Sequence, residues 1–511
     1  MQNFSTHILL LGAICGPLAA AESCDGLSGL ELPDTVITLA KTVAAGAFAL
    51  PVPATAPPAQ ALAARSQFQD LPGFCRVALD IHPTKDSDIR VEVWLPAAGW
   101  NGKFVGVGNG GWSGGIVYPL LRQALTRGYA AASTDTGHRG SDASFAVGHP
   151  EKLVDFGYRA VHEMTLKAKS VISAYYGRGP RLSYWNGCSS GGKQGLKEAQ
   201  RFPSDYDAIM AGAPANYWTH LMAGDLWPAQ ATLKDPAAYL TKEKYFLIHR
   251  AILDACDAAD GVKDGVLEDP ARCRFDLKAL ACEGDDGPGC LTAPQLAAAR
   301  KIYAGATNPR TGEQIFPGMV PGSELVWGAL AGGPKPFAIP ESHFRHIVFK
   351  DPDWDFRTLN FDRDVALADK LDNGLLNAID PDLKSFVERG GKLILYHGWN
   401  DQLIAPQNSI NYYSSVADAL GGASKIHSAI RLFMAPGMNH CSGGDGPSAF
   451  DHLAILDEWR DKGKAPDQII ASHLTDSKPD RTRPLCPYPQ IAKYKGTGST
   501  DEAENFTCAL P

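Results

Sequence analysis

Short apolar segments alternate with longer segments of helical periodicity from about Asp88 onward. The apolar segments are largely hydrophobic on both faces, which is typical of buried strands in a mostly parallel sheet. Stretches with helical spacing lie between them, notably 158–176 and 193–201. This alternation predicts an α/β fold with a doubly wound sheet. The expected strands are 91–95, 104–107, 130–133, 182–185, 208–211, 392–396 and 430–434.

The alternation stops near Tyr217 and resumes near Gly390. The intervening stretch has helical runs at 242–255 and 293–303, four cysteines, and a centre rich in glycine and proline. We interpret this stretch as a lid domain inserted into the sheet's connectivity. The predicted organisation is therefore a first part of the core at 22–216, a lid at 217–389 and a second part of the core at 390–511.

The composition is that of an ordinary soluble globular protein, since 44% of the 511 residues are hydrophobic and 20% are charged. The formal net charge of -8 argues against a nucleic acid or an anionic membrane as the main partner. Beyond the N-terminus, no apolar run reaches the roughly 18 residues that a membrane-spanning helix needs. We therefore expect neither a nucleic acid nor a membrane as the partner.

The first 21 residues have the pattern of a signal peptide. An apolar run begins at Ile8 and ends in three small residues, 19–21, as signal peptidase requires. Only His7 could supply a positive charge before it, so a disordered or membrane-anchored N-terminus is the alternative. Of the eleven cysteines, Cys15 alone lies in this segment, and its removal leaves an even number. These features predict a disulfide-bonded protein that is secreted or periplasmic.

A candidate nucleophile follows the predicted strand 182–185. The sequence Gly187-Cys188-Ser189-Ser190-Gly191 has the G-x-S-x-G pattern of a nucleophile elbow, and a predicted helix comes directly after it. The glycines allow a turn too tight for side chains, which lifts the Ser189 hydroxyl above the sheet. The backbone N–H of Ser190 then faces the developing oxyanion. The alternative reading is a plain glycine-rich turn.

A serine nucleophile needs a base that is held by an acid, and in α/β-hydrolases the chain order is serine, acid, histidine. Asp401 follows the predicted strand 392–396, and His440 follows the predicted strand 430–434. We therefore assign Asp401 as the acid and His440 as the base, against the alternatives of a turn residue and a surface histidine. His397 would break this order, so we interpret it as a pocket wall or a substrate contact.

The glycine run after the predicted strand 104–107 lies where these hydrolases supply the second N–H of the oxyanion hole. Gly111 is the first candidate for this donor and Gly110 the second. A flexible loop is the alternative. The adjacent Trp112 is a further candidate for a substrate contact.

These motifs together resemble the tannase and feruloyl esterase family. Its mark is a cysteine before the nucleophilic serine and another after the catalytic histidine, joined by a disulfide; here these are Cys188 and Cys441. Such a bond would clamp nucleophile and base together. The similarity extends to 107–112, 133–138 and 349–354. It implies that the substrates are esters of aromatic acids, such as feruloyl or galloyl esters. Terephthalate half-esters, which one branch of the family cleaves, are the alternative.

The predicted lid contains an acidic loop with the sequence DAADGVKDGV. Three carboxylates at this spacing, with glycines that allow sharp turns, can surround a hard cation such as Ca²⁺. The loop resembles the calcium site of the family, which maps here onto the side chains of Asp257, Asp260 and Asp264 and the carbonyls of Val262 and Val266. An acidic, solvated turn is the alternative.

The resemblance also implies a disulfide layout for the remaining cysteines. One bond would close the acidic loop, and the other three would be local in sequence or lie at the N-terminus. The implied pairs are Cys256–Cys273, Cys282–Cys290, Cys486–Cys508 and Cys24–Cys75.

The sequence thus predicts a secreted serine carboxylesterase that acts on a small aromatic ester through an acyl-enzyme. Structural Ca²⁺ is the expected metal, and no organic cofactor is expected. The alternative from another class is a catalytically inactive, calcium-stabilised binding protein.

Overall fold

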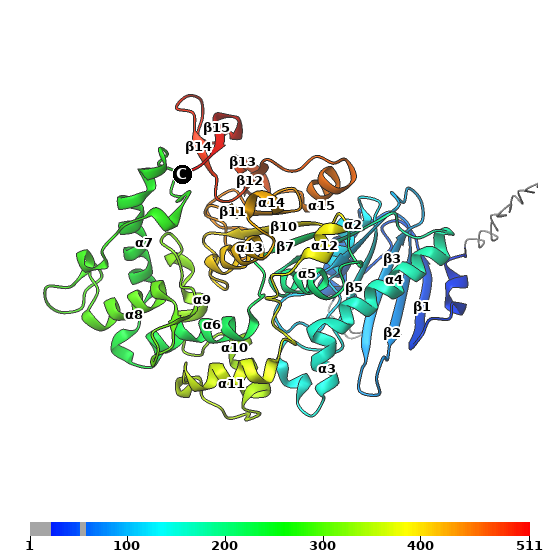
Figure 1. Ribbon diagram of the computed structural model, residues 1–511, viewed down its shortest axis with the longest axis horizontal. Coiled ribbons are helices and arrows are strands. Elements are labelled where there is room, and N and C mark those ends of the chain that lie inside the picture. The colour runs from blue at the N-terminus through cyan, green and yellow to red at the C-terminus, as the bar shows by residue number, and fades with distance from the viewer. Residues whose placement is uncertain (1–21, 52–57) are drawn as a thin grey trace, which may run out of the picture.

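The computed structural model describes residues 22–51 and 58–511 (Figure 1). The predicted signal peptide, 1–21, lies outside the described residues. A nine-stranded sheet forms the centre of the molecule. Its strands are β1 (Thr35–Val43), β2 (Phe74–Ile81), β3 (Ile89–Pro96), β4 (Lys103–Val107), β5 (Ala130–Thr134), β6 (Leu182–Cys188), β7 (Ala208–Gly212), β10 (Lys392–Gly398) and β11 (Ile430–Ala435).

The strand order is β1-β2-β3-β5-β4-β6-β7-β10-β11. The six strands from β5 to β11 pair in parallel, whereas β1, β2 and β3 join them through antiparallel pairs. All the predicted strands lie in this sheet, so the α/β-hydrolase fold with a doubly wound, mostly parallel sheet is confirmed. The prediction missed β1 and β2. The edge strand β1 has no fully buried residue, and its threonines and lysine interrupt the apolar pattern.

Helices cover both faces of the sheet. The side chains of α4, α5 and α13 pack with strand residues on one face, whereas α2 and α15 pack on the other. Figure 1 shows the first group in front of the strands. The helices of this core are α1 (Pro58–Ser66), α2 (Tyr118–Leu125), α3 (Pro150–Val154), α4 (Ala160–Tyr176), α5 (Ser190–Arg201), α12 (Lys384–Glu388), α13 (Gln407–Ala419), α14 (Ala423–Ile426) and α15 (His452–Leu456).

Residues 218–372, between β7 and β10, add no strand to the main sheet and lie to one side of it (Figure 1). The elements of this inserted segment are α6 (Trp218–Leu233), α7 (Lys242–Cys256), α8 (Ala293–Ala304), β8 (Ala306–Thr307), β9 (Gln314–Phe316), α9 (Gly328–Ala331), α10 (Ala338–Ser342) and α11 (Arg363–Asp372). Helices α7 and α8 share a hydrophobic cluster around Trp327. A second cluster joins α6 to the hydrolase core through Trp112 and Phe156.

Two β-hairpins follow the main sheet. They are formed by β12 (Ile469–Thr475) with β13 (Lys478–Leu485), and by β14 (Ile491–Tyr494) with β15 (Phe506–Ala509). The second hairpin contacts the acidic loop, since Ala492 and Phe506 pack with Val262 in one hydrophobic cluster. The Ala492 N–H also donates to the nearby Glu268 carboxylate at 2.8 Å.

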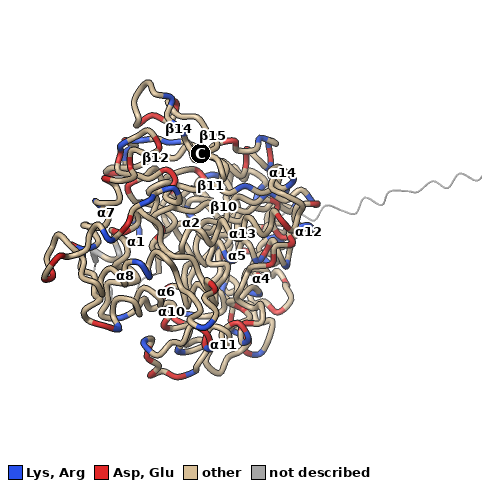
Figure 2. The backbone as a smooth tube through the Cα atoms, turned by 60° about the vertical axis from the view of Figure 1, so that its left-hand side comes forward, with Lys and Arg blue, Asp and Glu red and all other residues tan. Residues whose placement is uncertain are grey.

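Acidic and basic residues are interspersed over the molecule in Figure 2. Within 22–51 and 58–511, no helix is both long enough and apolar enough to cross a membrane.

Candidate active site

Ser189 occupies the sharp turn between β6 and α5. Its backbone has φ 63° and ψ -124°, a conformation that residues with a side chain rarely adopt. The turn is held because the Ser189 N–H donates to the Gly212 carbonyl at 2.9 Å and the Ala215 N–H donates to the Ser189 carbonyl at 3.1 Å. This strained strand–turn–helix geometry is that of a nucleophile elbow.

The neighbouring glycines are required by close backbone contacts. A Cβ atom on Gly187 would lie 2.5 Å from the Gly191 carbonyl oxygen. A Cβ atom on Gly108, just after β4, would lie 2.5 Å from the Gly191 Cα. Any side chain at these positions would therefore push β4 and β6 away from the first turn of α5.

Asp401 and His440 form a hydrogen-bonded pair. Nδ1 of His440 lies 2.7 Å from Oδ2 of Asp401, and the N–H groups of Leu403 and Ile404 donate to Oδ1 at 2.8 and 2.9 Å. Asp401 is fully buried. Burial by itself raises the pKa of this carboxyl, but the charge of His440 and hydrogen bonds from His440 and His397 outweigh it and lower the pKa below its ordinary value. Asp401 is therefore ionised and can orient the imidazole.

A disulfide between Cys188 and Cys441 joins the residue before Ser189 to the residue after His440. The two cysteine Cα atoms are 6.0 Å apart across a sequence separation of 253 residues. Because consecutive Cα atoms are 3.8 Å apart, this bond keeps the Cα atoms of Ser189 and His440 within about 14 Å. Gln402 holds the histidine loop as well, since its side-chain oxygen accepts the His440 N–H at 3.1 Å. Nothing local in the sequence marks Gln402 as part of the site.

The glycine loop after β4 lies beside the elbow. The Ser190 hydroxyl donates to the Gly111 carbonyl at 2.9 Å, which ties this loop, with Gly110, to the first turn of α5. Ser190 is the first residue of α5, and the backbone N–H groups of a first helical turn have no acceptor within the helix. A Cβ atom on Gly111 would lie 2.6 Å from Cδ1 of Ile339, so this α10 residue lies against the loop. Sequence reasoning missed Ile339, because nothing local marks it.

His397, which the sequence suggests as a pocket wall or a substrate contact, has a fully buried side chain. Its Nε2 lies 3.1 Å from Oδ2 of Asp401 and 2.9 Å from the Ile404 carbonyl, and its Nδ1 lies 2.7 Å from the Ser409 hydroxyl. His397 therefore supports Asp401 from behind.

Trp112, the other candidate for a substrate contact, is also buried, with only 1% of its surface exposed. Its Nε1 donates to the Ile339 carbonyl at 3.1 Å, and its ring packs edge-on against Trp218. Trp112 thus anchors the inserted segment to the glycine loop.

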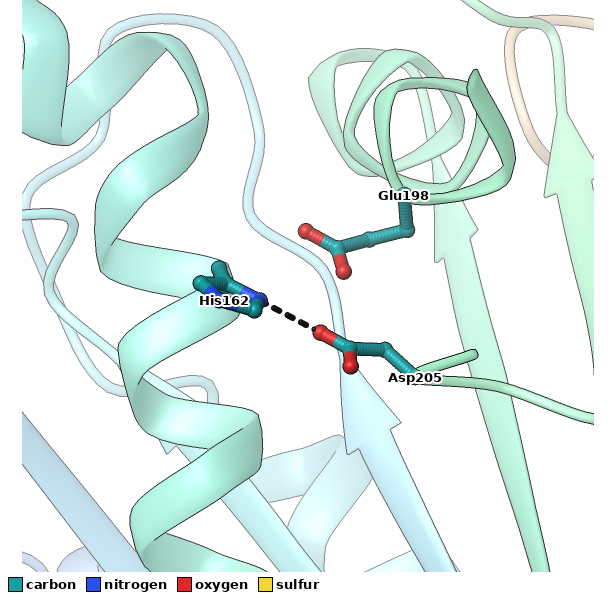
Figure 3. A group of neighbouring side chains, drawn as sticks. All are labelled: His162, Glu198 and Asp205. Carbon is teal, nitrogen blue, oxygen red and sulfur yellow. Dashed lines mark hydrogen bonds and ion pairs between the residues drawn. The ribbon is translucent and has the colours of Figure 1, made fainter. Parts of the chain in front are cut away.

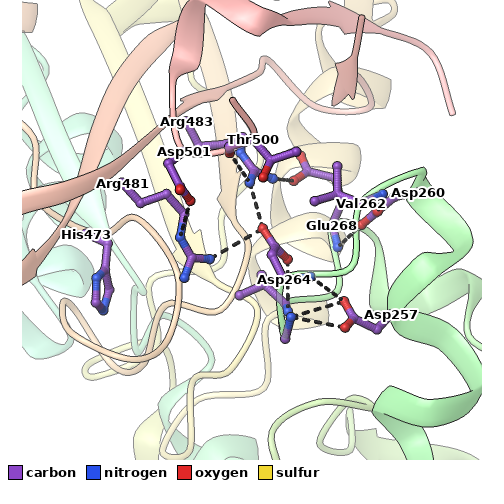
Figure 4. Close-up of polar contacts among 12 residues, drawn as sticks. Asp257, Asp260, Val262, Asp264, Glu268, His473, Arg481, Arg483, Thr500 and Asp501 are labelled. Carbon is purple, nitrogen blue, oxygen red and sulfur yellow. Dashed lines mark hydrogen bonds and ion pairs between the residues drawn. The ribbon is translucent and has the colours of Figure 1, made fainter. Parts of the chain in front are cut away.

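The acidic loop of the inserted segment holds its carboxylates by backbone hydrogen bonds (Figure 4). Asp257 accepts the N–H groups of Asp264 and Gly265, and Asp260 accepts those of Val262 and Glu268. Burial raises the pKa values of Asp257 and Asp260.

Two arginines from β13 reach the same loop (Figure 4). Arg483 donates to Asp264 at 2.7 Å, and Arg481 lies 3.4 Å from the same oxygen. In the part of the chain that the structure describes, the three loop carboxylates do not bring one oxygen each within 4.8 Å of one another.

Five disulfides are present among the described residues, and they are the pairs that the resemblance implied. They are Cys24–Cys75, Cys188–Cys441, Cys256–Cys273, Cys282–Cys290 and Cys486–Cys508.

Comparison with known proteins relates the whole chain to esterases. An uncharacterized esterase of Xanthomonas campestris pv. campestris is 40% identical and aligns with 98% of this chain and 93% of its own length. A probable feruloyl esterase B-1 of Aspergillus flavus is 34% identical over 85% of this chain and 86% of its own length.

Solved structures agree with this relationship. Feruloyl esterase B from Aspergillus oryzae superimposes with a TM-score of 0.88 at 30% identity, covering 95% of this chain and 99% of its own. Tannin acyl hydrolase from Aspergillus niger, at 22% identity and a TM-score of 0.77 over 94% of this chain and 92% of its own, shares the fold. The family model described as tannase and feruloyl esterase matches residues 75–509. The chain therefore belongs to the tannase and feruloyl esterase family and is a carboxylic ester hydrolase.

Proposed function

We propose that this chain is a serine carboxylesterase that hydrolyses esters of aromatic acids through an acyl-enzyme. The observation that carries the proposal is the hydrogen-bonded pair of Asp401 and His440, tied by the Cys188–Cys441 disulfide to the strained turn at Ser189. A buried acid, a partly exposed histidine and a serine at an elbow are the parts that acyl transfer requires.

In the first half of the reaction, the Ser189 hydroxyl attacks the ester carbonyl and His440 takes its proton. The N–H groups of Ser190 and Gly111 stabilise the oxyanion. The intermediate collapses when the bond to the leaving oxygen breaks and His440 returns the proton to the alcohol. In the second half, His440 deprotonates water, which attacks the acyl-enzyme. The bond to the Ser189 oxygen then breaks, His440 returns the proton to this oxygen, and the acid is released. Asp401 stabilises the imidazolium in both halves.

Two observations favour an aromatic acyl group. The relatives named feruloyl esterase B share about a third of their residues with this chain over most of its length. The apolar Ile339 lies against the proposed oxyanion loop, where the inserted segment meets the hydrolase core.

Five disulfides support export to an oxidising compartment, either outside the cell or in the periplasm.

Rates on methyl ferulate, methyl gallate and monomethyl terephthalate test the substrate class. We expect kcat/KM to be highest for one of the first two esters. A higher kcat/KM for monomethyl terephthalate would contradict feruloyl or galloyl esters as the substrate class and favour terephthalate half-esters.

A Ser189→Ala variant tests the nucleophile. Its kcat should fall by ~10³ or more with the fold intact, as losses from a catalytic triad do. More than about a tenth of the wild-type rate in the purified, folded variant would contradict the proposal. No hydrolysis of any ester by the wild type would favour an inactive binding protein.

We further propose that the acidic loop binds structural Ca²⁺ through the side chains of Asp257, Asp260 and Asp264. The chemistry of the donors supports it, because carboxylate oxygens with backbone carbonyls, here those of Val262 and Val266, form the ligand set that Ca²⁺ prefers. The buried Glu268 nearby adds a fourth carboxyl. Burial raises the pKa of this group to about 8. A bound cation would stabilise the ionised forms of these acids and would take no part in ester hydrolysis.

A further inference from the structure

A second group of potential metal ligands includes a side chain of α5, the helix that follows the nucleophile. His162 comes from α4, Glu198 from α5 and Asp205 from the turn before β7, and Figure 3 shows their side chains converging. One ligand atom from each residue lies within 4.8 Å of the others. Among the described residues, no other group of three histidines, cysteines or acids does so. Neither ester hydrolysis nor the proposed Ca²⁺ loop uses these residues.

Glu198 is the unusual member of this group. Its side chain is 1% exposed, and neither carboxylate oxygen has a hydrogen-bond partner in the described structure. A buried carboxylate without donors is strongly unfavourable, so this group requires either a proton or a cation.

The other two ligands are already aligned. Nδ1 of His162 lies 2.6 Å from Oδ2 of Asp205, and the imidazole stacks on Phe202 with ring centroids 3.7 Å apart. The Asp205 carbonyl also accepts a hydrogen bond from Nζ of Lys169 at 2.5 Å, which fixes the turn. The side chain of His162 is 24% exposed, so the group borders solvent on this side.

We propose that His162, Glu198 and Asp205 bind one divalent transition-metal ion, for which Zn²⁺ is the matching probe. One imidazole nitrogen with two carboxylate oxygens is a ligand set that Zn²⁺ accepts, whereas Ca²⁺ prefers oxygen alone. The metal replaces the proton between His162 and Asp205, and a water molecule takes the open position. Binding therefore releases protons to solvent. The ion would tie α4 to α5 and to the turn before β7.

Calorimetric titration of the full-length protein with ZnCl₂, in buffer that contains Ca²⁺, tests this site. The wild type should bind one Zn²⁺ per chain and release protons, which titrations in buffers of different ionisation enthalpy detect. His162→Gln and Glu198→Gln should each weaken binding by at least about tenfold. Glu163→Gln is the matched control on α4, since Glu163 pairs with Lys167 outside the group. Asp260→Asn is the control for the acidic loop, and both controls should bind Zn²⁺ like the wild type.

Thermal unfolding with and without Zn²⁺ gives an independent readout. Zn²⁺ should raise the Tm of the wild type and of both controls, but not that of Glu198→Gln. That variant should melt at or above the wild-type temperature in the absence of metal, because its neutral amide replaces a buried acid. The proposal fails if the wild type does not bind Zn²⁺, or if His162→Gln and Glu198→Gln bind it as tightly. The carboxyls would then only share a proton.

Discussion

Removing the Cys188–Cys441 disulfide should damage both stability and catalysis, and the two effects can be separated. The perturbation is the double variant Cys188→Ala with Cys441→Ala, which leaves neither cysteine of this pair as a free thiol. In the chain-entropy model, a bond across 253 residues stabilises the folded state by about 5.5 kcal/mol. Measured values usually fall below the model, so we expect the free energy of unfolding to drop by about 3–5 kcal/mol.

The catalytic effect follows from the position of the bond. Ser189 and His440 lie on separate loops, and the bond fixes the position of one loop relative to the other. A displacement of about 1 Å between reacting groups can lower a rate about 100-fold. We therefore expect kcat for the preferred ester to fall by about 10- to 100-fold under conditions where the variant is still folded.

The matched control is Cys282→Ala with Cys290→Ala, which removes a disulfide in the inserted segment with a separation of 8 residues. The same model gives a loss of about 2.5 kcal/mol for this bond. Guanidinium unfolding measures both losses, and steady-state kinetics in the native baseline measures kcat. The control should keep its kcat. Equal losses of kcat in the two variants, or a folded Cys188→Ala/Cys441→Ala variant with full activity, would refute the positioning role.

Three further predictions follow from the same contacts. Asp401→Asn should lower kcat by up to ~10⁴, though less than His440→Ala, because it misorients the base without deleting it; wild-type activity would point to another acid. Chelation of Ca²⁺ should lower the Tm, since a ligand at 100 times its Kd stabilises the folded state by about 2.7 kcal/mol. The Ca²⁺ site would be contradicted if elemental analysis of the purified protein finds no calcium and an Asp260→Ala variant melts like the wild type. Lys193 is fully buried between the rings of Phe156 and Trp218, without a hydrogen-bond partner among the described residues, and burial lowers its pKa from 10.5 to about 7. Between pH 7 and pH 10.5, Lys193 is therefore protonated in the unfolded state and largely neutral in the folded state. The free energy of unfolding should rise with pH across this window, by at most about 1.4 kcal/mol per pH unit. Lys193→Met should abolish that rise in guanidinium unfolding at pH 7 and 9, and an unchanged slope would contradict it.

Local patterns were enough to predict the central strands and the elbow. The parallel strands are buried on both faces, so each appears in the sequence as a short apolar run. The turn at Ser189 depends on Gly187 and Gly191 within a few residues, so its signal is also local. The order of Ser189, Asp401 and His440 along the chain follows from the topology of the sheet.

Disulfide pairing was less determined by the residues themselves, because ten cysteines allow many connectivities. The resemblance to a family with a known layout supplied the five pairs. No property of the spacing alone would have selected Cys188 and Cys441, which are separated by 253 residues.

Burial, by contrast, was decided by the tertiary structure. His397 near the end of β10 and Trp112 after β4 lie at the edge of the sheet where active sites form, yet both side chains are buried. Ile339 reaches Gly111 only because α10 folds back over the glycine loop. The group of His162, Glu198 and Asp205 likewise exists only because the fold brings side chains of α4, α5 and the turn before β7 together. A sequence encodes which residues can form a strand or a turn through neighbours a few positions away, whereas the environment of a side chain is the sum of contacts that only the folded chain brings together.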